Sequence, residues 1–204
     1  MPRSIRRRTF LSTGLSTGLS AGLAGVTAAL WSDAASAQSA RGAAFDPVLV
    51  RVRADVAPNE LHVLPDAFMV YWTMPGGVAM RYRCGVGRPG LYESGEFFVG
   101  AKKEWPSWTP TPEMIERSPE KYAQFADGVP GGPDNPLGAR AIYLFEPGRG
   151  DTFLRIHGTN APGTIGSAVS NGCARLINSE IIDLYERVPM RSRVVLHPKA
   201  DGSA

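Results

Sequence analysis

The 204-residue sequence is poor in metal ligands and in long apolar runs. It has two cysteines, Cys84 and Cys173, and three histidines, scattered along the chain. So few cysteine and histidine side chains offer no ligand cluster for a metal ion, and we expect neither a metal nor another cofactor. Beyond residue 37, no segment approaches the roughly 18 apolar residues that a membrane-spanning helix needs. These absences argue against a metalloprotein and against spans in the body of the chain.

An excess of one charge sign is also missing once the N-terminus is set aside. The whole chain has 22 Lys and Arg against 19 Asp and Glu, but residues 1–37 hold four of the basic residues and one acidic residue. The remaining 167 residues therefore carry 18 of each. Phosphate binding draws on a basic surplus, so we expect no nucleic-acid partner. The length and the 43% hydrophobic content suit one domain of ordinary size.

The N-terminal basic residues have the pattern of an export signal. Arginines at positions 6–8 precede an uncharged stretch over residues 10–30, which is the order of the basic and apolar regions of a signal peptide. Residues 7–11, Arg-Arg-Thr-Phe-Leu, resemble the twin-arginine export motif, and residues 35–37, Ala-Ser-Ala, fit the small-residue cleavage pattern. We predict a twin-arginine-type signal peptide over residues 1–37 and a periplasmic mature protein without a stable membrane span. A retained N-terminal anchor is the alternative.

Composition and turn signals favour a β-rich fold. The 23 glycines and 17 prolines make up about a fifth of the chain, which points to turns rather than to a helix bundle. Short runs of β-branched and aromatic residues alternate with Pro and Gly turns. The predicted strands are 48–52, 60–64, 68–73, 78–86, 96–102, 140–145, 152–157 and 193–197. The spacing of the first five predicts an antiparallel meander.

Two segments have helical signals. Pro112–Arg117 has proline near a helix start and acidic residues in its first turn. Residues 179–188 carry apolar side chains at helical spacing, with Asn178 or Ser179 available as N-cap. The segment 105–138 is rich in proline and has little other regular structure. We expect it either to wall a cleft or to pack as a surface loop.

One segment near the C-terminal end has the residues for nucleophilic catalysis. His157 ends a predicted strand sixteen residues before Cys173, and a thiol nucleophile needs a nearby base and a third group that fixes the tautomer of that base. No acidic side chain lies between the two residues, so a backbone carbonyl at Gly158 or Thr159 would hold the imidazole. Gly172 leaves steric room for backbone N–H groups to face a developing oxyanion.

Each of these residues also has a purely structural explanation. Two cysteines in an exported protein commonly form one disulfide, and a bridge between Cys84 and Cys173 would stabilise the fold by roughly 4 to 5 kcal/mol in the chain-entropy model. A histidine at a strand end is commonly a hydrogen-bonded core residue, which would explain His157. The spacing between cysteine and histidine does not decide between these explanations.

Beyond this pair, several ordered blocks of the sequence resemble the L,D-transpeptidase catalytic domain, a family of cysteine enzymes that act on bacterial peptidoglycan. The likeness covers most of residues 58–197. The matching blocks are Ile156–Asn160, Ile165–Gly166, Ser170–Leu176, Trp105–Pro112, Gly131–Arg140 and Ile181–Val188. With the resemblance, the chain divides into the signal peptide, a linker with the first strand over residues 38–57, a catalytic domain over 58–197 and a C-terminal tail over 198–204.

The resemblance implies a mainly β fold with two sheets, sandwich-like or barrel-like, and short helices. It implies that Cys173 is the nucleophile, that His157 is the general base and acid, that the Gly158 carbonyl orients the imidazole, and that the Gly172 N–H faces the oxyanion. Residues expected to meet substrate are Thr159, Trp108, Ser170, Asn171 and Arg175. For Arg175 an ordering role in its own loop is favoured. Asn171 stands where many family members carry histidine.

The implied function is that of an exported peptidoglycan L,D-transpeptidase acting on stem peptides as a monomer. Cys173 would attack the bond between the third residue and D-Ala, form a thioester and pass the acyl group to an amine, giving a 3-3 crosslink. Alternatives are an L,D-carboxypeptidase, a lipoprotein-attaching transpeptidase and, from another class, a non-catalytic peptidoglycan-binding module. Because a nucleophilic thiol must be free, we predict that Cys84 and Cys173 are not bridged.

Overall fold

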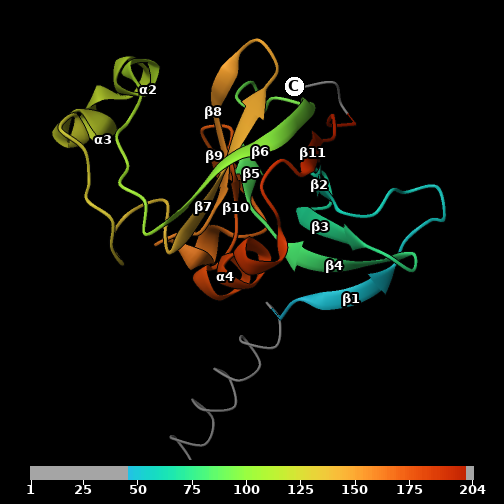
Figure 1. Cartoon of the computed structure of the whole chain (residues 1–204). Helices are drawn as coiled ribbons and strands as arrows, with labels where there is room; N and C mark the ends of the chain where they lie inside the picture. The colour runs from blue at the N-terminus through green and yellow to red at the C-terminus, as the bar shows by residue number, and fades with distance from the viewer. Residues whose placement is uncertain (1–45, 201–204) are drawn as a thin grey trace, which may run out of the picture. The chain divides into compact units, whose positions relative to one another are not determined.

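The structure is a computed structural model and describes residues 46–200 (Figure 1). The predicted signal peptide, most of the predicted linker and the last four residues lie outside this part. The strands are β1 (Val48–Arg51), β2 (Glu60–Leu64), β3 (Met69–Met74), β4 (Val78–Arg83), β5 (Val86–Gly87), β6 (Gly95–Glu104), β7 (Arg140–Glu146), β8 (Gly150–His157), β9 (Ala168–Ser170), β10 (Ala174–Arg175) and β11 (Arg193–Leu196). The helices are α2 (Pro112–Arg117), α3 (Pro119–Tyr122) and α4 (Asn178–Arg187), with short 3-10 turns η1 (Ala123–Phe125) and η2 (Pro162–Thr164). The predicted mainly β fold with short helices is confirmed.

The strands form two open sheets. The larger has nine strands in the order β1-β4-β3-β2-β11-β6-β7-β8-β10, and the smaller pairs β5 with β9. The meander predicted for the first five strands holds only for β2, β3 and β4, because β1 pairs with β4 rather than with β2, and β6 lies beyond the C-terminal strand β11 on the β2 side. β11 runs parallel to β2 and antiparallel to β6, so it joins the part of the large sheet formed by β1 to β4 to the part that begins with β6.

The strand predicted over residues 78–86 breaks into β4 and β5. Gly85, between them, exchanges two backbone hydrogen bonds of 2.8 Å with Arg175. A Cβ at Gly85 would lie only 2.8 Å from the Arg175 guanidinium. At this point the chain ends its pairing with β3 and pairs instead with the segment around β10, at the opposite edge of the large sheet. This pairing brings the small sheet against the loop that carries Cys173.

Helix α4 packs its apolar face into the core. Ile181 and Leu184 are fully buried, and helix and β7 are in contact. The Tyr82 hydroxyl donates to Asp183 at 2.7 Å, and the Lys102 ammonium donates to the carbonyl of Val188 at 2.8 Å, past the helix end. Each fully buried large aliphatic side chain contributes about 1.5 to 3 kcal/mol. Within residues 46–200, no helix has both the length and the apolar character to cross a membrane.

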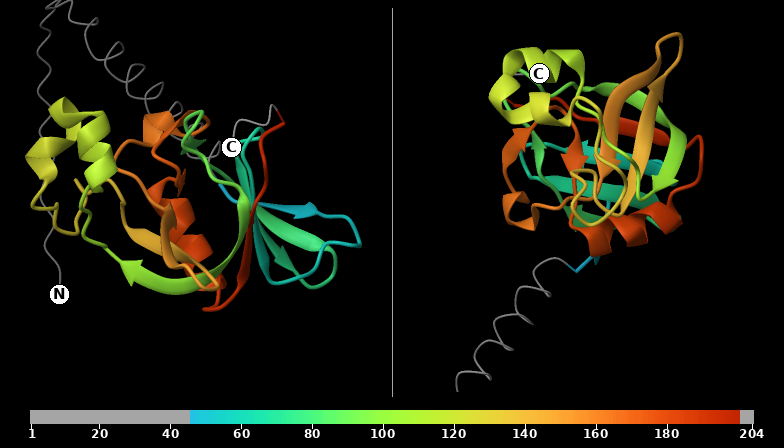
Figure 2. Two further views of the ribbon diagram at one scale, coloured as in Figure 1. Left: turned by 90° about the horizontal axis from the view of Figure 1, so that it is seen from above. Right: turned by 90° about the vertical axis from the view of Figure 1, so that its left-hand side faces the viewer.

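The proline-rich segment 105–138 folds into a small unit of its own. Trp108 and Val129 exchange backbone hydrogen bonds of 2.9 and 2.6 Å, which closes the segment on itself. The Trp108 ring meets the edges of Tyr122 and Phe125, with centroids 6.2 and 6.0 Å apart. The sequence predicted α2 with the observed bounds, but not α3. Both helices lie beside β7 and β8, at the opposite end of the large sheet from β1 to β4 (Figures 1 and 2).

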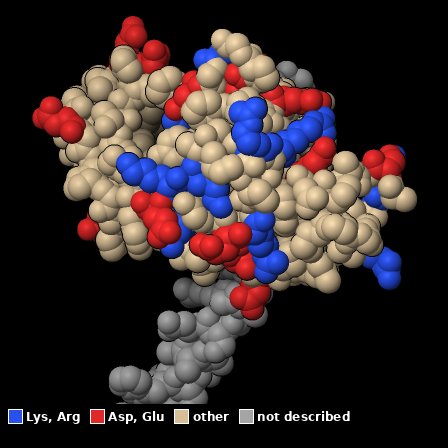
Figure 3. Space-filling model, viewed as in Figure 1, with Lys and Arg blue, Asp and Glu red and all other residues tan. Residues whose placement is uncertain are grey.

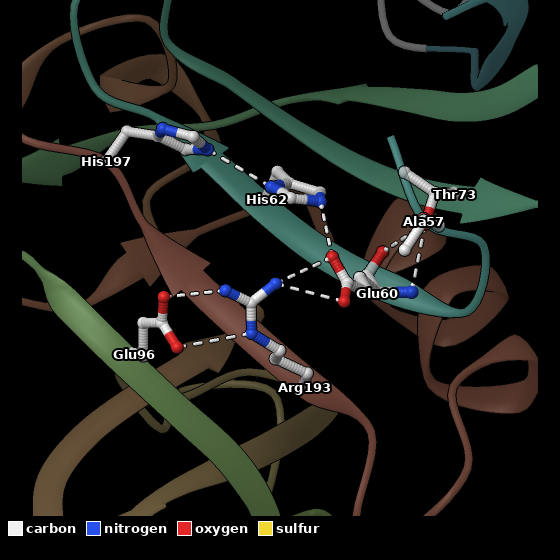
Figure 4. Close-up of polar contacts among 7 residues, drawn as sticks. All are labelled: Ala57, Glu60, His62, Thr73, Glu96, Arg193 and His197. Atoms are coloured by element: carbon white, nitrogen blue, oxygen red, sulfur yellow. Dashed lines mark hydrogen bonds and ion pairs between the residues drawn. The ribbon is translucent and has the colours of Figure 1, made fainter. Parts of the chain in front are cut away.

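A polar cluster ties β2, β11 and β6 together (Figure 4). Arg193 binds Glu60 at 3.0 Å and Glu96 at 2.6 Å, on the strands to either side of its own. His62 lies 3.1 Å from His197 and 3.3 Å from Glu60. Burial is the main cause that lowers the pKa of both histidines. On the face shown in Figure 3, acidic and basic side chains are intermixed in the same way, which agrees with the balanced charge of this part of the chain.

Candidate active site

Strands β8 and β10 bring the two predicted reacting residues together. They run parallel, with Arg175 paired to His157 and Ala174 paired to Ile156. Because side chains alternate along a strand, Cys173, directly before β10, lies on the same face as Arg175 and therefore as His157. The two side chains line one cleft of about 970 Å³.

His157 is held as a neutral imidazole. Its side chain is buried, with 5% exposed, and Nδ1 lies 2.6 Å from the Gly158 carbonyl. A carbonyl only accepts, so Nδ1 carries the hydrogen and Nε2 keeps its lone pair. Burial lowers the pKa of His157 to about 4; the Gly158 carbonyl opposes this, while the positive charges of Arg175 and Arg155 add to it. The predicted contact between Gly158 and the imidazole is present, and a neutral ring can accept a proton.

The Cys173 thiol is half-buried and protonated at neutral pH. Burial raises its pKa, whereas a hydrogen bond from the Arg155 backbone N–H and the charges of Arg155 and Arg175 lower it. The sulfur also lies 3.9 Å from the Phe153 carbonyl oxygen. A protonated thiol beside a neutral imidazole is a resting state from which attack on a carbonyl requires proton transfer to a base.

Both cysteines are free. Cys84 is fully buried, and its pKa is raised by that burial and by the nearby carboxyl of Glu180. A thiol in this position is unreactive and packs as a small apolar side chain. The prediction of two unbridged thiols is confirmed, and the disulfide alternative is wrong.

The turn before Cys173 is ordered by Ser170. Its hydroxyl donates to the Cys173 carbonyl at 2.7 Å and accepts from the Gly172 N–H at 3.3 Å. Gly172 has φ of 124°, and a Cβ there would lie 2.9 Å from the Leu91 carbonyl oxygen, so only glycine fits. The N–H predicted to face an oxyanion is thus bonded within its own turn, and the oxyanion role of Gly172 stays a prediction.

Arg175 orders the loop opposite the nucleophile. Its guanidinium donates to the Thr164 hydroxyl at 2.9 Å and to the Thr164 carbonyl at 3.4 Å. These contacts have the geometry of the loop-ordering role favoured from the sequence. The side chain also lines the cleft, next to Cys173.

Asn171 and Trp108 connect the proline-rich segment to the nucleophile loop. The Asn171 amide donates to the Tyr122 hydroxyl at 2.8 Å, and its oxygen accepts from Arg117 at 2.9 Å. Trp108 contacts the ring of the same tyrosine edge-on and lines the cleft. Residues of α2 and α3 also line the cleft, so the segment 105–138 walls it, one of the two arrangements expected from the sequence.

Asn178 positions the chain around His157, a role that the sequence reasoning missed. The expectation that Asn178 or Ser179 caps α4 was wrong, because Ile177 is the N-cap and makes no side-chain cap bond. The Asn178 oxygen instead accepts from the N–H groups of Ala139, at 3.0 Å, and Thr159, at 3.2 Å. Thr159 is itself buried, with its hydroxyl accepting from the Ala161 N–H. The tightly packed glycines at 138 and 158 were the available signal, because any side chain there would collide with Asn178.

A bulge in β8 was also missed. Between the pairs Tyr143–Arg155 and Phe145–Asp151, β8 has three residues where β7 has one. At its centre Phe153 adopts φ of 61° and is 69% exposed at the cleft. The Asp151 carboxylate holds the bulge through the Phe153 N–H at 2.9 Å and the Arg155 guanidinium at 2.6 Å. Bulges and left-handed residues of this kind concentrate at functional sites.

Comparison with known proteins identifies the family. The sequence profile of the YkuD family, described as the L,D-transpeptidase catalytic domain, matches residues 58–196. The chain belongs to this L,D-transpeptidase family. The family acts on peptidoglycan.

Individual relatives agree with this family. The Escherichia coli (strain K12) protein ErfK/SrfK, named as a probable L,D-transpeptidase, is 45% identical over 96 residues, which are 47% of this chain and 29% of the relative. A Fuscovulum blasticum protein from the ATP synthase subunits region, whose name also describes an L,D-transpeptidase, is 36% identical over 149 residues. The match covers 72% of this chain and 68% of the relative. The chain thus spans under a third of the Escherichia coli relative.

Solved structures support the same fold. A Brucella melitensis crystal structure is 46% identical with a TM-score of 0.51, covering 71% of this chain and 89% of its own, although it is named as a probable carnitine operon oxidoreductase. An Enterococcus faecium L,D-transpeptidase, a C442S mutant, has a TM-score of 0.52 at 16% identity, with 70% of this chain and 50% of its own covered. At that identity the likeness concerns the fold alone.

Proposed function

We propose that this protein is an exported peptidoglycan L,D-transpeptidase with Cys173 as nucleophile and His157 as general base and acid. The observation that carries the proposal is the neutral His157, fixed by the Gly158 carbonyl on the same face and in the same cleft as the Cys173 thiol. Family membership supports the reaction class, and the site residues supply the chemistry.

The first half-reaction is acylation. The Cys173 sulfur attacks the carbonyl of the third residue of a donor stem peptide while His157 takes the thiol proton. Collapse of the tetrahedral intermediate breaks the bond to D-Ala, and His157 returns the proton to the leaving amine. The intermediate's oxyanion needs N–H donors in the turn before Cys173, and Gly172 would supply one once it is released from Ser170.

The second half-reaction transfers the acyl group. An amine of a neighbouring stem peptide attacks the thioester with His157 as base, which gives a 3-3 crosslink and regenerates the thiol. Water as acceptor would make the protein an L,D-carboxypeptidase, and an amine of a lipoprotein would make it an attaching enzyme. The same acyl-enzyme serves each acceptor, so these outcomes share the first half-reaction.

Export is the second part of the proposal. The twin-arginine-like residues 7–11 and the cleavage pattern at 35–37 support a signal peptide, and the substrate of the family lies outside the cytoplasm. A twin-arginine route exports folded protein, which suits an enzyme whose two cysteines must stay unbridged.

The test uses the mature protein, residues 38–204, and purified tetrapeptide muropeptides. We expect the intact mass to rise by the donor less D-Ala, and both this rise and D-Ala release to vanish in Cys173→Ala. Cys84→Ala is the matched control, because it removes the other thiol and should keep the activity. Unchanged D-Ala release by Cys173→Ala would refute the mechanism, and donor binding with no mass change in the unaltered protein would favour the binding-module alternative. Adding candidate amines then identifies the acceptor.

A further inference from the structure

Two arginines converge on the neutral amide of Asn171, which lines the cleft together with Arg117. Arg117, from α2, donates to the Asn171 oxygen at 2.9 Å, and Arg88, just after β5, approaches the same oxygen at 3.4 Å. The Arg88 backbone N–H also donates to the Ser170 carbonyl at 3.0 Å, which fixes this arginine against the nucleophile loop. Two positive groups that share one uncharged acceptor repel each other, and an anion between them would relieve that repulsion.

Two of the other arginines that line the cleft are already paired with carboxylates. Arg149 binds Glu93 at 2.6 Å, and Arg155 binds Asp151 at 2.6 Å. By contrast, within residues 46–200 neither Arg88 nor Arg117 has a carboxylate within 4.0 Å. Most of the donor groups of each guanidinium therefore stay available for a ligand. A guanidinium fork matches a carboxylate in both geometry and charge.

The position of this pair relative to Cys173 fits one end of the donor. Asn171 precedes Cys173 by two residues in the turn that carries the thiol, and both side chains line the same cleft. In the donor, the carboxylate of the leaving residue lies one residue beyond the carbonyl that the thiol attacks, at about 4 Å. The long side chains of the two arginines suit a carboxylate at this short distance from the attacked carbonyl.

We propose that Arg117 and Arg88 form a carboxylate subsite that holds the C-terminal carboxylate of the donor's leaving residue. Asn171 keeps the two guanidinium groups together when the subsite is empty and yields them to the ligand. The inference rests on the proposed function and deepens it, because it makes the enzyme selective for donors with a free carboxylate one residue past the scissile bond. Donors that are amidated or extended at that position should react slowly.

The test compares a tetrapeptide donor with its C-terminal carboxamide, read as the rate of Cys173 acylation by intact mass. The unaltered protein should prefer the free acid by about 10- to 100-fold in kcat/KM, the range expected for hydrogen bonds to a charged group. Arg117→Gln and Arg88→Gln should each slow the free acid and leave the carboxamide nearly unchanged, so that the preference shrinks. Arg53→Gln, an exposed arginine on the β1–β2 connection, is the matched control and should keep the full preference.

Three results would overturn the subsite. Equal rates for the two donors in the unaltered protein would show that no group reads the carboxylate. An equal loss for both donors in Arg117→Gln and in Arg88→Gln would mean that these arginines only hold α2 against the nucleophile loop. Retained preference in both variants would place the recognition elsewhere. If neither donor acylates the unaltered protein, the proposed function itself fails and the subsite falls with it, a result that differs visibly from the other three.

Discussion

Two buried ionisable groups should give the fold opposite responses to pH. The His157 imidazole has its pKa lowered to about 4 from an ordinary 6.5, mainly by burial. The Glu180 carboxyl is 1% exposed and has its pKa raised to about 7 from an ordinary 4.5, again mainly by burial. One of its oxygens accepts from the Arg83 N–H at 3.4 Å. Both groups therefore favour their neutral forms in the folded state.

The signs follow from which state binds more protons. As the pH falls through 6.5 toward 4, unfolded chains protonate His157 and folded chains do not, so the folded state loses stability. As the pH rises through 4.5 toward 7, unfolded chains ionise Glu180 and folded chains resist, so the folded state again loses stability. Between pH 7.5 and 4.5 each effect amounts to about 2 to 3 kcal/mol, and the two nearly cancel.

Single variants separate the two effects. Relative to the unaltered protein, His157→Gln should gain about 2 to 3 kcal/mol in free energy of unfolding on going from pH 7.5 to 4.5, and Glu180→Gln should lose about as much. The measurement is urea unfolding of the mature protein at a series of pH values. His62 and His197 also have lowered pKa values, but they are present in every protein compared and drop out of the difference.

The double variant His157→Gln/Glu180→Gln serves as the control, and its stability relative to the unaltered protein should change little with pH. If the stability of both single variants changed with pH in the same way as that of the unaltered protein, the reasoning would be refuted. Neither buried group would then titrate differently in the folded and unfolded states. Slopes of the same sign would refute the opposition between the imidazole and the carboxyl.

Two further substitutions test the frame around the site. Asn178→Ala removes the acceptor of two N–H groups, so we expect the free energy of unfolding, measured by urea unfolding, to fall by roughly 2 kcal/mol. Asn178→Asp should recover most of this loss. Equal stability of the alanine variant would contradict the positioning role. Gly172→Ala forces a side chain into a left-handed position against the Leu91 carbonyl. Donor acylation, measured by intact mass, should slow at least about tenfold, while the variant keeps a cooperative thermal unfolding transition. An unchanged rate would show that the turn need not hold its conformation.

Local patterns predicted the long elements well. The alternation of apolar residues located β2 and the proline-led start located α2 with the observed bounds, and all eight predicted strands correspond to observed ones. The short strands β9 and β10 escaped prediction, since a pairing of two or three residues depends on a distant partner and leaves no periodicity to read. The position of β11 between β2 and β6 has the same cause, because strand order is set by contacts across the whole chain.

The site was predictable to the extent that its residues lie close in the sequence. Cys173, His157 and the Gly158 carbonyl came from one segment and from the family resemblance. Asn178 was misassigned because a helix N-cap is the locally favoured use of asparagine. Its actual partners, Ala139 and Thr159, are 39 and 19 residues away. Leaving the two buried N–H groups without an acceptor would cost more free energy than leaving the exposed start of the helix without a side-chain cap.

The electrostatics of the cleft link the resting state to the proposed subsite. Arg155 and Arg175 lower the pKa of both reacting residues, which favours a thiolate at Cys173 but disfavours a protonated His157. Burial acts against charge on either residue, so the free enzyme keeps the neutral pair. A donor carboxylate beside Arg88 and Arg117 brings negative charge near this pair and offsets part of the positive field. The imidazolium then becomes less costly and the Cys173 thiolate more costly, so the two effects oppose each other, and the donor carboxylate positions the substrate rather than driving the proton transfer.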